Sequence, residues 1–467
     1  NNITNTRLGI YLRSSLNNNI FGNRIKNCGE AVLLSSSNNT ISRNDIANSI
    51  DGVDISYSSN NTVTGNNVTN SRYGIRLYDS SNSTISENKI ENSKDSGIDL
   101  SGSSGSTIFG NVIRNSDEGV RLTSSSNNTL SRNNITNNTF GLCLYGGDNN
   151  SLTENTFFED GLYVVRSYGN KVENNLVNGK PLIYLEGVSD YTVENAGQVI
   201  LIRCSNISVE KLNLTSTTVG VELLETSDTK ISANNITNST YGILLFLSSS
   251  NSMIRNNITN SSHAGIDLLY SSNNSIRGNN ITNNNRDITQ YGGGITLYKS
   301  ESNRVSGNNI TANKGSGIML RQSLNNSIVG NNITNSWGYG ILLYQSSNSF
   351  VYHNNFVYNL LQSGTYNSVN AWDDGYPSGG NYWTVYTYAG VDVKSGTGQD
   401  LPGSDGIGDT ALTMRENNID HYPLMAPISV FDAGTWNGTS YNVDIISNST
   451  VSKFQLNVTE KTIRFNV

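Results

Sequence analysis

The chain has 467 residues, of which 35% are hydrophobic and only 14% are charged, and its formal net charge is −7. Its basic residues are scattered rather than clustered, which argues against a nucleic-acid-binding protein. No stretch of about 18 apolar residues occurs, so we expect no membrane-spanning helix in this chain.

Residues 66–87 contain the unit from which most of the chain is built. Its three short segments, 67–69, 74–78 and 83–86, each place one or two aliphatic side chains on one face, and polar turn residues separate them. None of them has the apolar spacing of a helix. One copy cannot bury its aliphatic face, but stacked copies can.

Aliphatic or aromatic residues recur in three series with a period of about 22 residues. The series begin with Ile3, Ile25, Ile46 and Val68, with Ile10, Val32, Val53 and Ile75, and with Ile20, Ile41, Val63 and Ile85. Three series at one period predict three faces per coil, and therefore an all-β, parallel β-helix. Asparagine pairs recur at one corner and predict stacked amide ladders, with Asn39 pointing inward beside Ile41.

The regularity changes along the chain. Coils are regular to about residue 175, have different turns between 175 and 231, and are regular again to Phe356, with a loop expected around 286–291. We therefore predict a β-helix over 1–358. Residues 359–427 are rich in Tyr, Trp, Gly and Asp without a repeat, and are expected to cap its end. Residues 428–467 should hold strands at 441–445, 454–458 and 463–465. Three short strands are too few for a β-sandwich of their own, so this tail should need a partner.

Three non-repeating stretches resemble the NosD-like proteins, a group of secreted right-handed β-helices. The matching stretches are 178–185, 197–201 and 372–383, the last continuing through 403–409. The resemblance implies a right-handed β-helix at an extracellular or cell-surface location, of the archaeal surface-protein type. Because both ends of the chain fall inside strand patterns, we expect processing from a longer precursor.

The bacterial members that name this group assist copper-site assembly in a reductase. Copper calls for clustered His, Met or Cys, whereas His263, His353 and His421 are dispersed. The three cysteines, Cys28, Cys143 and Cys204, also lie coils apart. We therefore expect neither a copper site nor a disulfide.

A charged row is predicted on the outward side of the second strand of each coil. It comprises Asp54, Arg76, Asp99 and Arg121, one from each of four successive coils. Asp54 and Asp99 should lie roughly 9.6 Å apart, near the carboxylate separation of an inverting glycosidase, and the row also resembles the charged face of β-helical polysaccharide lyases. Alternating charge is equally an ordinary ladder, in which each arginine keeps its neighbouring carboxyl ionised. Asp54, Arg76, Asp99 and Arg121 are therefore weak catalytic candidates.

The same face becomes apolar toward the C-terminus. The predicted apolar row comprises Leu244, Phe246, Leu269, Tyr298, Met319, Leu342 and Tyr344. An exposed row of this size could stack sugar rings, receive another subunit, or lie beneath a folded-back segment.

The acidic loop 400–409 offers hard oxygen ligands on turns that glycine permits. Asp400, Asp405 and Asp409 are candidate ligands for a structural calcium ion, and the alternative is an acidic turn without metal.

Asn-x-Ser/Thr triplets recur along the chain, and in a secreted protein several should carry glycans. Repeat chemistry alone would also generate many of them. The candidate acceptors are Asn38, Asn60, Asn67, Asn82, Asn127, Asn134, Asn235, Asn257, Asn280, Asn309, Asn332 and Asn437.

Together these features favour an extracellular structural or adhesive protein without catalysis, which assembles head to tail with copies of itself. The alternative is a carbohydrate-binding or carbohydrate-cleaving protein that uses the outer face of the β-helix.

Overall fold

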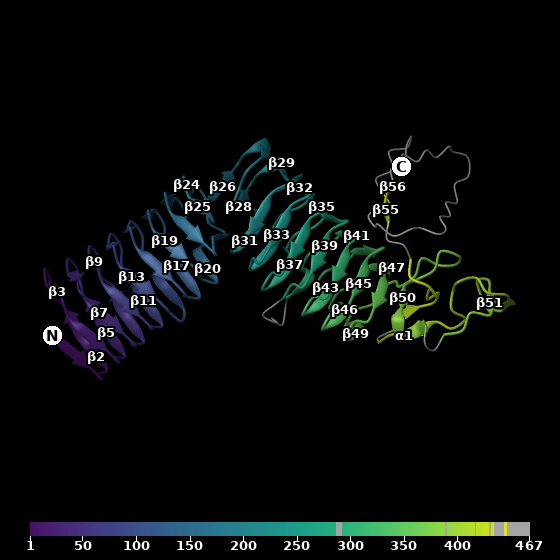
Figure 1. Ribbon diagram of the computed structural model, residues 1–467, viewed down its shortest axis with the longest axis horizontal. Coiled ribbons are helices and arrows are strands. Elements are labelled where there is room, and N and C mark those ends of the chain that lie inside the picture. Colours follow the sequence, from purple (N-terminus) through teal and green to yellow (C-terminus); the bar gives the residue numbers. More distant parts are fainter. Residues whose placement is uncertain (286–291, 388–389, 416, 429–430, 434–442, 446–467) are drawn as a thin grey trace. The chain divides into compact units, whose positions relative to one another are not determined.

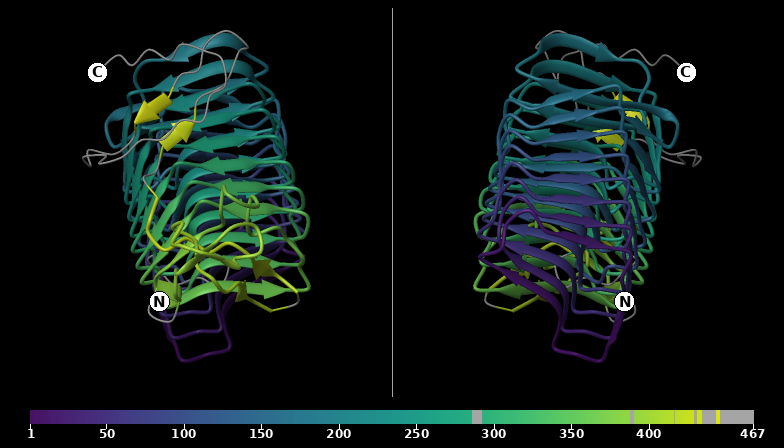
Figure 2. Two further views of the ribbon diagram at one scale, coloured as in Figure 1. Left: turned by 90° about the vertical axis from the view of Figure 1, so that its right-hand side faces the viewer. Right: turned by 90° about the vertical axis from the view of Figure 1, so that its left-hand side faces the viewer.

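The structure is a computed structural model that describes residues 1–285, 292–387, 390–415, 417–428, 431–433 and 443–445. It forms two compact units, one of Asn1–Thr229 with Asn234–Ser248 and one of Lys230–Ala233 with Ser249–Val467. Within each unit, strands of successive coils lie above one another (Figure 1, Figure 2). The pairing is parallel and in register, as in Val68 with Ile90 and Ile75 with Ile98. The predicted all-β parallel β-helix is confirmed.

The first unit begins with three parallel sheets. The first sheet contains β1 (Asn2–Thr4), β4 (Arg24–Lys26), β7 (Asp45–Ala47), β10 (Asn67–Thr69), β13 (Lys89–Glu91), β16 (Val112–Arg114), β19 (Asn134–Thr136), β22 (Thr156–Phe158) and β25 (Leu176–Val177). The second contains β2 (Leu8–Arg13), β5 (Glu30–Ser35), β8 (Asp51–Ser56), β11 (Tyr73–Tyr78), β14 (Ser96–Ser101), β17 (Glu118–Thr123), β20 (Phe140–Tyr145) and β23 (Leu162–Val165). The third contains β3 (Asn19–Phe21), β6 (Thr40–Ser42), β9 (Thr62–Thr64), β12 (Thr84–Ser86), β15 (Thr107–Phe109), β18 (Thr129–Ser131), β21 (Ser151–Thr153) and β24 (Lys171–Glu173).

The first unit continues with further coils after an antiparallel turn between β25 and β26. These strands are β26 (Lys180–Glu186), β27 (Ser189–Val193), β28 (Gln198–Ile202), β29 (Ser205–Glu210), β30 (Asn213–Thr215), β31 (Val219–Leu224), β33 (Asn235–Thr237) and β34 (Tyr241–Phe246).

The second unit repeats the three-sheet arrangement. One sheet contains β32 (Lys230–Ser232), β35 (Ser252–Ile254), β38 (Ser275–Arg277), β41 (Arg304–Ser306), β44 (Ser327–Val329) and β47 (Phe350–Tyr352). Another contains β36 (Asn257–Thr259), β39 (Asn280–Thr282), β42 (Asn309–Thr311), β45 (Asn332–Thr334), β48 (Asn355–Val357) and β50 (Tyr382–Trp383). The third contains β37 (Ala264–Leu269), β40 (Gly293–Tyr298), β43 (Ser316–Arg321), β46 (Tyr339–Tyr344) and β49 (Leu361–Tyr366).

The rest of the second unit has short elements. They are α1 (Thr384–Thr387), β51 (Lys394–Ser395), β52 (Leu401–Pro402), β53 (Leu412–Thr413), β54 (Ile419–Asp420), β55 (Phe431–Ala433) and β56 (Val443–Ile445). The strands β55 and β56 pair antiparallel. The loop expected at 286–291 and the strands expected at 454–458 and 463–465 lie outside the described residues.

The repeat forms coils because each residue type suits its position. Ile75, Ile98 and Val120 are fully buried and lie above one another, which forms a continuous apolar core. Asparagines such as Asn70 occupy left-handed corner positions, with φ of 54°, which asparagine tolerates better than other side chains. At Gly74 a Cβ would lie only 2.5 Å from the carbonyl oxygen of Gly97, so this bend requires glycine.

An inner asparagine column accompanies the apolar core. In the first unit it comprises Asn23, Asn44, Asn66, Asn88, Asn111, Asn133, Asn155 and Asn175, all buried. Asn111 is typical: its Nδ2 donates to Asn133 Oδ1 at 2.9 Å and to the carbonyl oxygen of Ile85 at 3.0 Å. Its backbone N–H also donates to Asn133 Oδ1, at 3.0 Å. The predicted amide ladder is confirmed, and it satisfies backbone and side-chain groups that the corner would otherwise bury unpaired.

A side-chain seam replaces strand pairing within the first unit. Because the chain turns back at β26, the edge of β23 meets side chains rather than the backbone of a following strand. Gln198 accepts a hydrogen bond from the backbone N–H of Leu162 at 2.9 Å and donates to its carbonyl oxygen at 2.6 Å. Both carboxyl oxygens of Glu222 lie 3.3 Å from the N–H of Val164. Burial raises the pKa of Glu222 well above its usual value.

Two tryptophans cover the apolar core at the end of the second unit. Trp383 stacks on Phe356 with ring centroids 4.4 Å apart, and its Nε1 donates to Asp420 Oδ2 at 2.8 Å. Trp372 is buried beside Trp383. Strand pairing continues past residue 358, through β49 and β50, and the capping role of residues 359–427 stays a prediction.

Replacing Asn133 by Ala should lower the free energy of unfolding by about 2–4 kcal/mol, because two donors of Asn111 lose their acceptor in a buried site. Urea unfolding followed by circular dichroism measures this. The neighbouring exposed Asn134 is the matched control, and Asn134→Ala should change stability by less than about 0.5 kcal/mol. Equal losses at the two positions would contradict the ladder's role.

Asp160 ends a second buried column, in which it follows Ser93, Ser116 and Asn138. The Nδ2 and the backbone N–H of Asn138 donate to Asp160 Oδ2 at 2.7 and 3.1 Å. Burial raises the pKa of Asp160 from 3.8 to about 7. A raised folded-state pKa contributes stability below pH 3.8 that is lost as the pH rises through 7. Asp160→Asn should therefore stabilise the protein by about 2–4 kcal/mol at pH 8 and leave it unchanged near pH 3.5. Equal thermal midpoints of variant and parent at pH 8 would show that this carboxyl ionises without cost.

Candidate functional site

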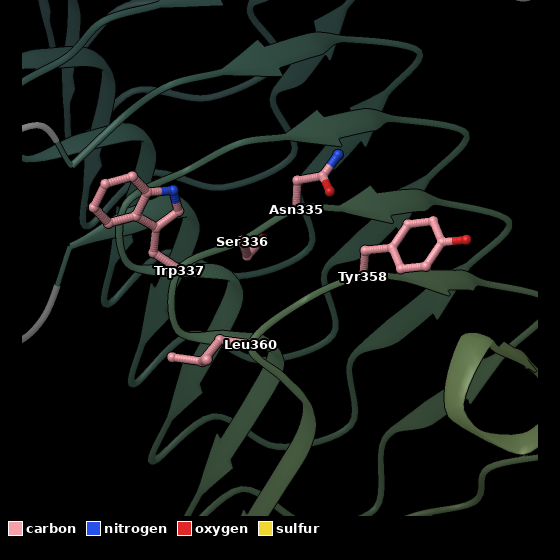
Figure 3. Close-up of a pocket in the computed structure, with 5 residues that line it drawn as sticks. All are labelled: Asn335, Ser336, Trp337, Tyr358 and Leu360. Carbon is pink, nitrogen blue, oxygen red and sulfur yellow. The ribbon is translucent and has the colours of Figure 1, made fainter.

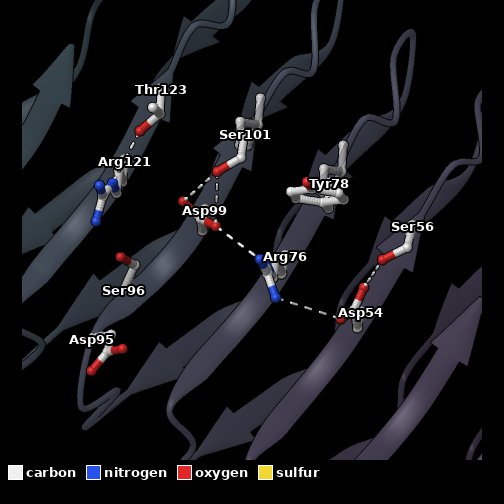
Figure 4. A network of polar contacts seen from close by, with 12 residues as sticks. Asp54, Ser56, Arg76, Tyr78, Asp95, Ser96, Asp99, Ser101, Arg121 and Thr123 are labelled. Atoms are coloured by element: carbon white, nitrogen blue, oxygen red, sulfur yellow. Dashed lines mark hydrogen bonds and ion pairs between the residues drawn. The ribbon is translucent and has the colours of Figure 1, made fainter. Parts of the chain in front are cut away.

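The structure brings the predicted charged row together on one sheet of the first unit. Asp54, Arg76, Asp99 and Arg121 come from β8, β11, β14 and β17, and they pair side by side in register. Arg76 lies between the two acids, with Nε 3.5 Å from Asp99 Oδ2 and Nη1 4.0 Å from Asp54 Oδ2 (Figure 4). One guanidinium therefore bridges both carboxylates.

Aromatic side chains flank the arginines of the charged row. The Arg76 guanidinium lies 5.0 Å from the ring centroid of Tyr73 and 5.2 Å from that of Tyr78. Arg121 lies 5.2 Å from the ring centroid of Tyr145, and its Nη1 is 3.5 Å from Glu118 Oε2. The carboxylates thus neutralise the guanidinium charges, and the cation–π contacts help to hold the guanidinium groups in place.

The carboxyls of the charged row are almost inaccessible. Asp54 is 7% exposed and Asp99 is 3% exposed. Burial raises the pKa of Asp99, and the attraction of Arg76 and Arg121 offsets this only in part. The pKa of Asp99 is therefore raised despite its two arginine neighbours, and the expectation that they keep the carboxyls of the row ionised stays a prediction.

A third acid lies beside the row. Burial and the nearby charge of Asp54 raise the pKa of Asp51 to about 6. Asp51 lies at the start of β8 and is half-buried. Sequence reasoning missed it because it occupies a turn-proximal position rather than the outward strand position.

The predicted apolar row is largely covered. Leu244 and Met319 are buried, Phe246, Leu269, Tyr298 and Leu342 are partly buried, and of the seven only Tyr344 counts as exposed. Lys299 and Arg321 lie over the Tyr298 ring, each with its charged group 5.4 Å from the centroid. Two long basic side chains, Lys299 directly after β40 and Arg321 from the neighbouring β43, thus shield the Tyr298 ring that the sequence pattern turns outward. The role of this row as an interface or ligand patch stays a prediction.

An exposed aromatic cleft in the second unit was not predicted. It has a volume of about 460 Å³ and is lined by Asn335, Ser336, Trp337, Tyr358 and Leu360 (Figure 3). The residues lie at the corners that follow β45 and β48. The sequence did contain a signal for this cleft, because Trp337 and Tyr358 occupy corners that carry no aromatic residue in earlier coils. Two such earlier corners are 260–262 (Asn-Ser-Ser) and 312–314 (Ala-Asn-Lys).

The candidate glycan acceptors lie on the surface where they are described. Asn38, Asn60, Asn82 and Asn127 are exposed at left-handed corners, with φ between 54° and 58°. Asn134, Asn235 and Asn309 are exposed on strands, and Asn67, Asn257, Asn280 and Asn332 are partly buried. Asn437 lies outside the described residues.

The carboxylates of the acidic loop act as hydrogen-bond acceptors for its backbone. Asp409 Oδ1 accepts from the N–H groups of Val393 and Lys394, each at 3.1 Å, and Asp405 Oδ1 accepts from the N–H of Ile407 at 3.0 Å. Asp392, which sequence reasoning missed, accepts from the Gly406 N–H at 2.9 Å. Asp400 is exposed. The calcium assignment to Asp400, Asp405 and Asp409 stays a prediction.

The cysteine and histidine side chains of the described residues lie apart from one another. All three cysteines are buried without disulfides, and burial raises the pKa of the Cys143 and Cys204 thiols. His353 Nε2 lies 2.9 Å from the carbonyl oxygen of Ser378, and His421 Nδ1 lies 2.8 Å from Asp373 Oδ2. Among the residues that the structure describes, no three or more His, Cys, Asp or Glu side chains form a group that could hold a metal.

No helix within the described ranges is long and apolar enough to cross a membrane. A search of the curated proteins found no match.

Solved structures of several carbohydrate-active proteins are similar to this chain. One is DFA-IIIase from Arthrobacter chlorophenolicus A6, in complex with GF2 and without its lid, with 12% identity, 49% of this chain and 55% of that chain covered, and a TM-score of 0.29. Another is the periplasmic alginate epimerase AlgG, with 13% identity and a TM-score of 0.29; the match covers 71% of this chain and 76% of the AlgG chain. A third is the A-module of the Azotobacter vinelandii mannuronan C-5 epimerase AlgE6, with 13% identity and a TM-score of 0.26; the match covers 71% of this chain and 90% of the AlgE6 chain. This chain thus spans about half the length of the DFA-IIIase chain, and we infer no function from these likenesses.

A family model described as "Periplasmic copper-binding protein (NosD)" matches residues 1–161 and 188–388. The two matched segments cover most of the chain and include the coils that carry the charged row and the aromatic cleft. The chain therefore belongs to the NosD family.

Proposed function

We propose that this chain acts outside the cytoplasm as a non-catalytic, structural or adhesive β-helical scaffold. The observation that carries the proposal is the state of the charged row, where Arg76 bridges Asp54 and Asp99 and both acids are nearly inaccessible. A general acid or base must come within hydrogen-bond reach of its substrate. The row instead forms an internal ladder that ties neighbouring coils together.

The metal chemistry suggested by the family's description does not fit these residues. The thiols are buried and isolated, and the imidazoles of His353 and His421 already contact a carbonyl oxygen and a carboxylate. Copper sites in proteins use clustered soft or imidazole ligands. We therefore assign the chain no copper-dependent role.

Two features support a location outside the cytoplasm. The family description is periplasmic, and the exposed Asn-x-Ser/Thr corners at Asn38, Asn60, Asn82 and Asn127 are sterically suited to glycans. Head-to-tail assembly of copies and the archaeal origin stay predictions.

Incubation with acidic and with neutral polysaccharides should yield no new reducing ends and no unsaturated products, because the row presents no accessible acid–base pair. Asp99→Asn and Arg121→Ala should match the parent chain in this assay. Turnover by the parent that either substitution abolishes would overturn the proposal and favour a lyase or hydrolase.

If calcium stabilises the cap, adding it in about 100-fold excess over its Kd should raise the free energy of unfolding by about 2.7 kcal/mol. Chelator should reverse the shift, and Asp405→Asn should abolish it. Asp117→Asn, at an exposed site in the first unit, serves as the control. Scanning fluorimetry measures the shift, and the same melting temperature with calcium and with chelator would identify the loop as an acidic turn without metal.

A further inference from the structure

The aromatic cleft is held on a rigid backbone. The corner after β45 carries Asn335, Ser336 and Trp337, and the corner after β48 carries Tyr358 and Leu360. The N–H of Asn335 donates to the carbonyl oxygen of Val357 at 3.0 Å, and the N–H of Leu360 donates to that of Ser336 at 2.9 Å. The two corners are therefore fixed against each other before any ligand binds.

The fold does not require apolar side chains at these corners. The middle residue of each corner is buried: the backbone N–H of Ser336 donates to Asn359 Oδ1 at 3.0 Å, and one coil earlier Asn313 Nδ2 donates to the carbonyl oxygen of Ile281 at 3.1 Å. Trp337, Tyr358 and Leu360 flank these buried positions and are 60%, 64% and 73% exposed. Leaving three large apolar groups in water gives no gain in folding, so their placement points to a binding role.

The size of the cleft favours a small ligand. Its volume of about 460 Å³ lies within the range of small-molecule sites, about 300–1,000 Å³. A stable protein partner would need about 800 Å² on each side, contributed by roughly 20–30 residues. Five lining residues cannot supply such an interface.

The chemistry of the cleft favours a sugar. An indole and a phenol ring offer flat faces for the C–H side of a pyranose, while the Asn335 amide and the Tyr358 hydroxyl can exchange hydrogen bonds with sugar hydroxyls. The lining residues carry no charge. The nearby Lys314 Nζ lies 5.6 Å from the Trp337 ring centroid, where its charge favours an anionic group on the ligand.

We propose that the cleft formed by Trp337, Tyr358 and Asn335 binds pyranose rings of an oligosaccharide, and that Lys314 makes it prefer uronic acids over neutral sugars. This binding site goes beyond the scaffold role. If the cleft binds no sugar, the proposal of a non-catalytic scaffold still stands. If the chain cleaves polysaccharide, the scaffold proposal fails, but the proposal of a sugar-binding cleft does not.

Titration of the full chain with a hexasaccharide of uronic acids and with a neutral glucan hexasaccharide tests the proposal. Of the three tryptophans that the structure describes, Trp337 is exposed whereas Trp372 and Trp383 are buried. In a Trp436→Phe background, ligand should therefore shield tryptophan fluorescence from acrylamide quenching. Calorimetry should show tighter binding of the uronic acid probe. Trp337→Ala and Tyr358→Ala should each weaken binding at least about tenfold, and Lys314→Gln should remove the preference between probes.

The matched control is Tyr57→Ala, which removes an aromatic side chain that is 73% exposed in the first unit and should leave binding unchanged. Thermal midpoints equal to that of the parent would establish that each variant is folded. Binding by Trp337→Ala as tight as by the parent, or no binding of either probe by the parent, would overturn the proposal. Equal affinity for the two probes would overturn the role of Lys314.

Discussion

The inner asparagine column is the interaction on which the rest of the structure depends. A polypeptide that turns a corner three times per coil must bury backbone groups at each corner, and unpaired groups there cost about 1–3 kcal/mol each. The Asn88 and Asn111 side chains solve this by bonding both the next asparagine and a carbonyl oxygen of the preceding coil. The same bonds fix the register of neighbouring coils, so that Ile85 lies above Val63 and beneath Ile108 in a continuous apolar core.

Fixed register has a consequence for the outer faces. Residues at equivalent positions of successive coils lie side by side whatever their chemistry, and together they form a row along the sheet. Asp54, Arg76 and Asp99 form an ion-paired ladder in this way. Because Asp54 and Asp99 are nearly inaccessible, the ladder can link neighbouring coils, but its carboxylates cannot reach a substrate. Side chains at the corners, such as the exposed Trp337, can instead project without disturbing the sheets, and the binding site that we propose lies at such corners.

Much of this fold could be predicted because the repeat encodes it. The burial of Ile75, Ile98 and Val120, the inward position of Asn39 and the register of the charged row all follow from period and alternation. The rest depends on contacts that a repeat does not encode. The raised pKa of Asp99 and the covered Tyr298 result from side chains of adjacent strands. The seam at Gln198 and Glu222 joins residues far apart in sequence, and Gly-Val-Glu-Leu at 220–223 looks like any other coil. The cleft depends on one tryptophan at a corner that tolerates many residues.

A double-mutant cycle on the inner asparagine column tests most directly whether neighbouring coils support one another through their amides. The first cycle combines Asn111→Ala with Asn133→Ala, two residues that share a hydrogen bond. The second combines Asn44→Ala with Asn133→Ala, which bond other members of the column and not each other. The free energy of unfolding should show a coupling of about 0.5–3 kcal/mol for the first pair and less than about 0.5 kcal/mol for the second. Indistinguishable coupling in the two cycles would contradict the account, because the column would then be a set of independent side chains.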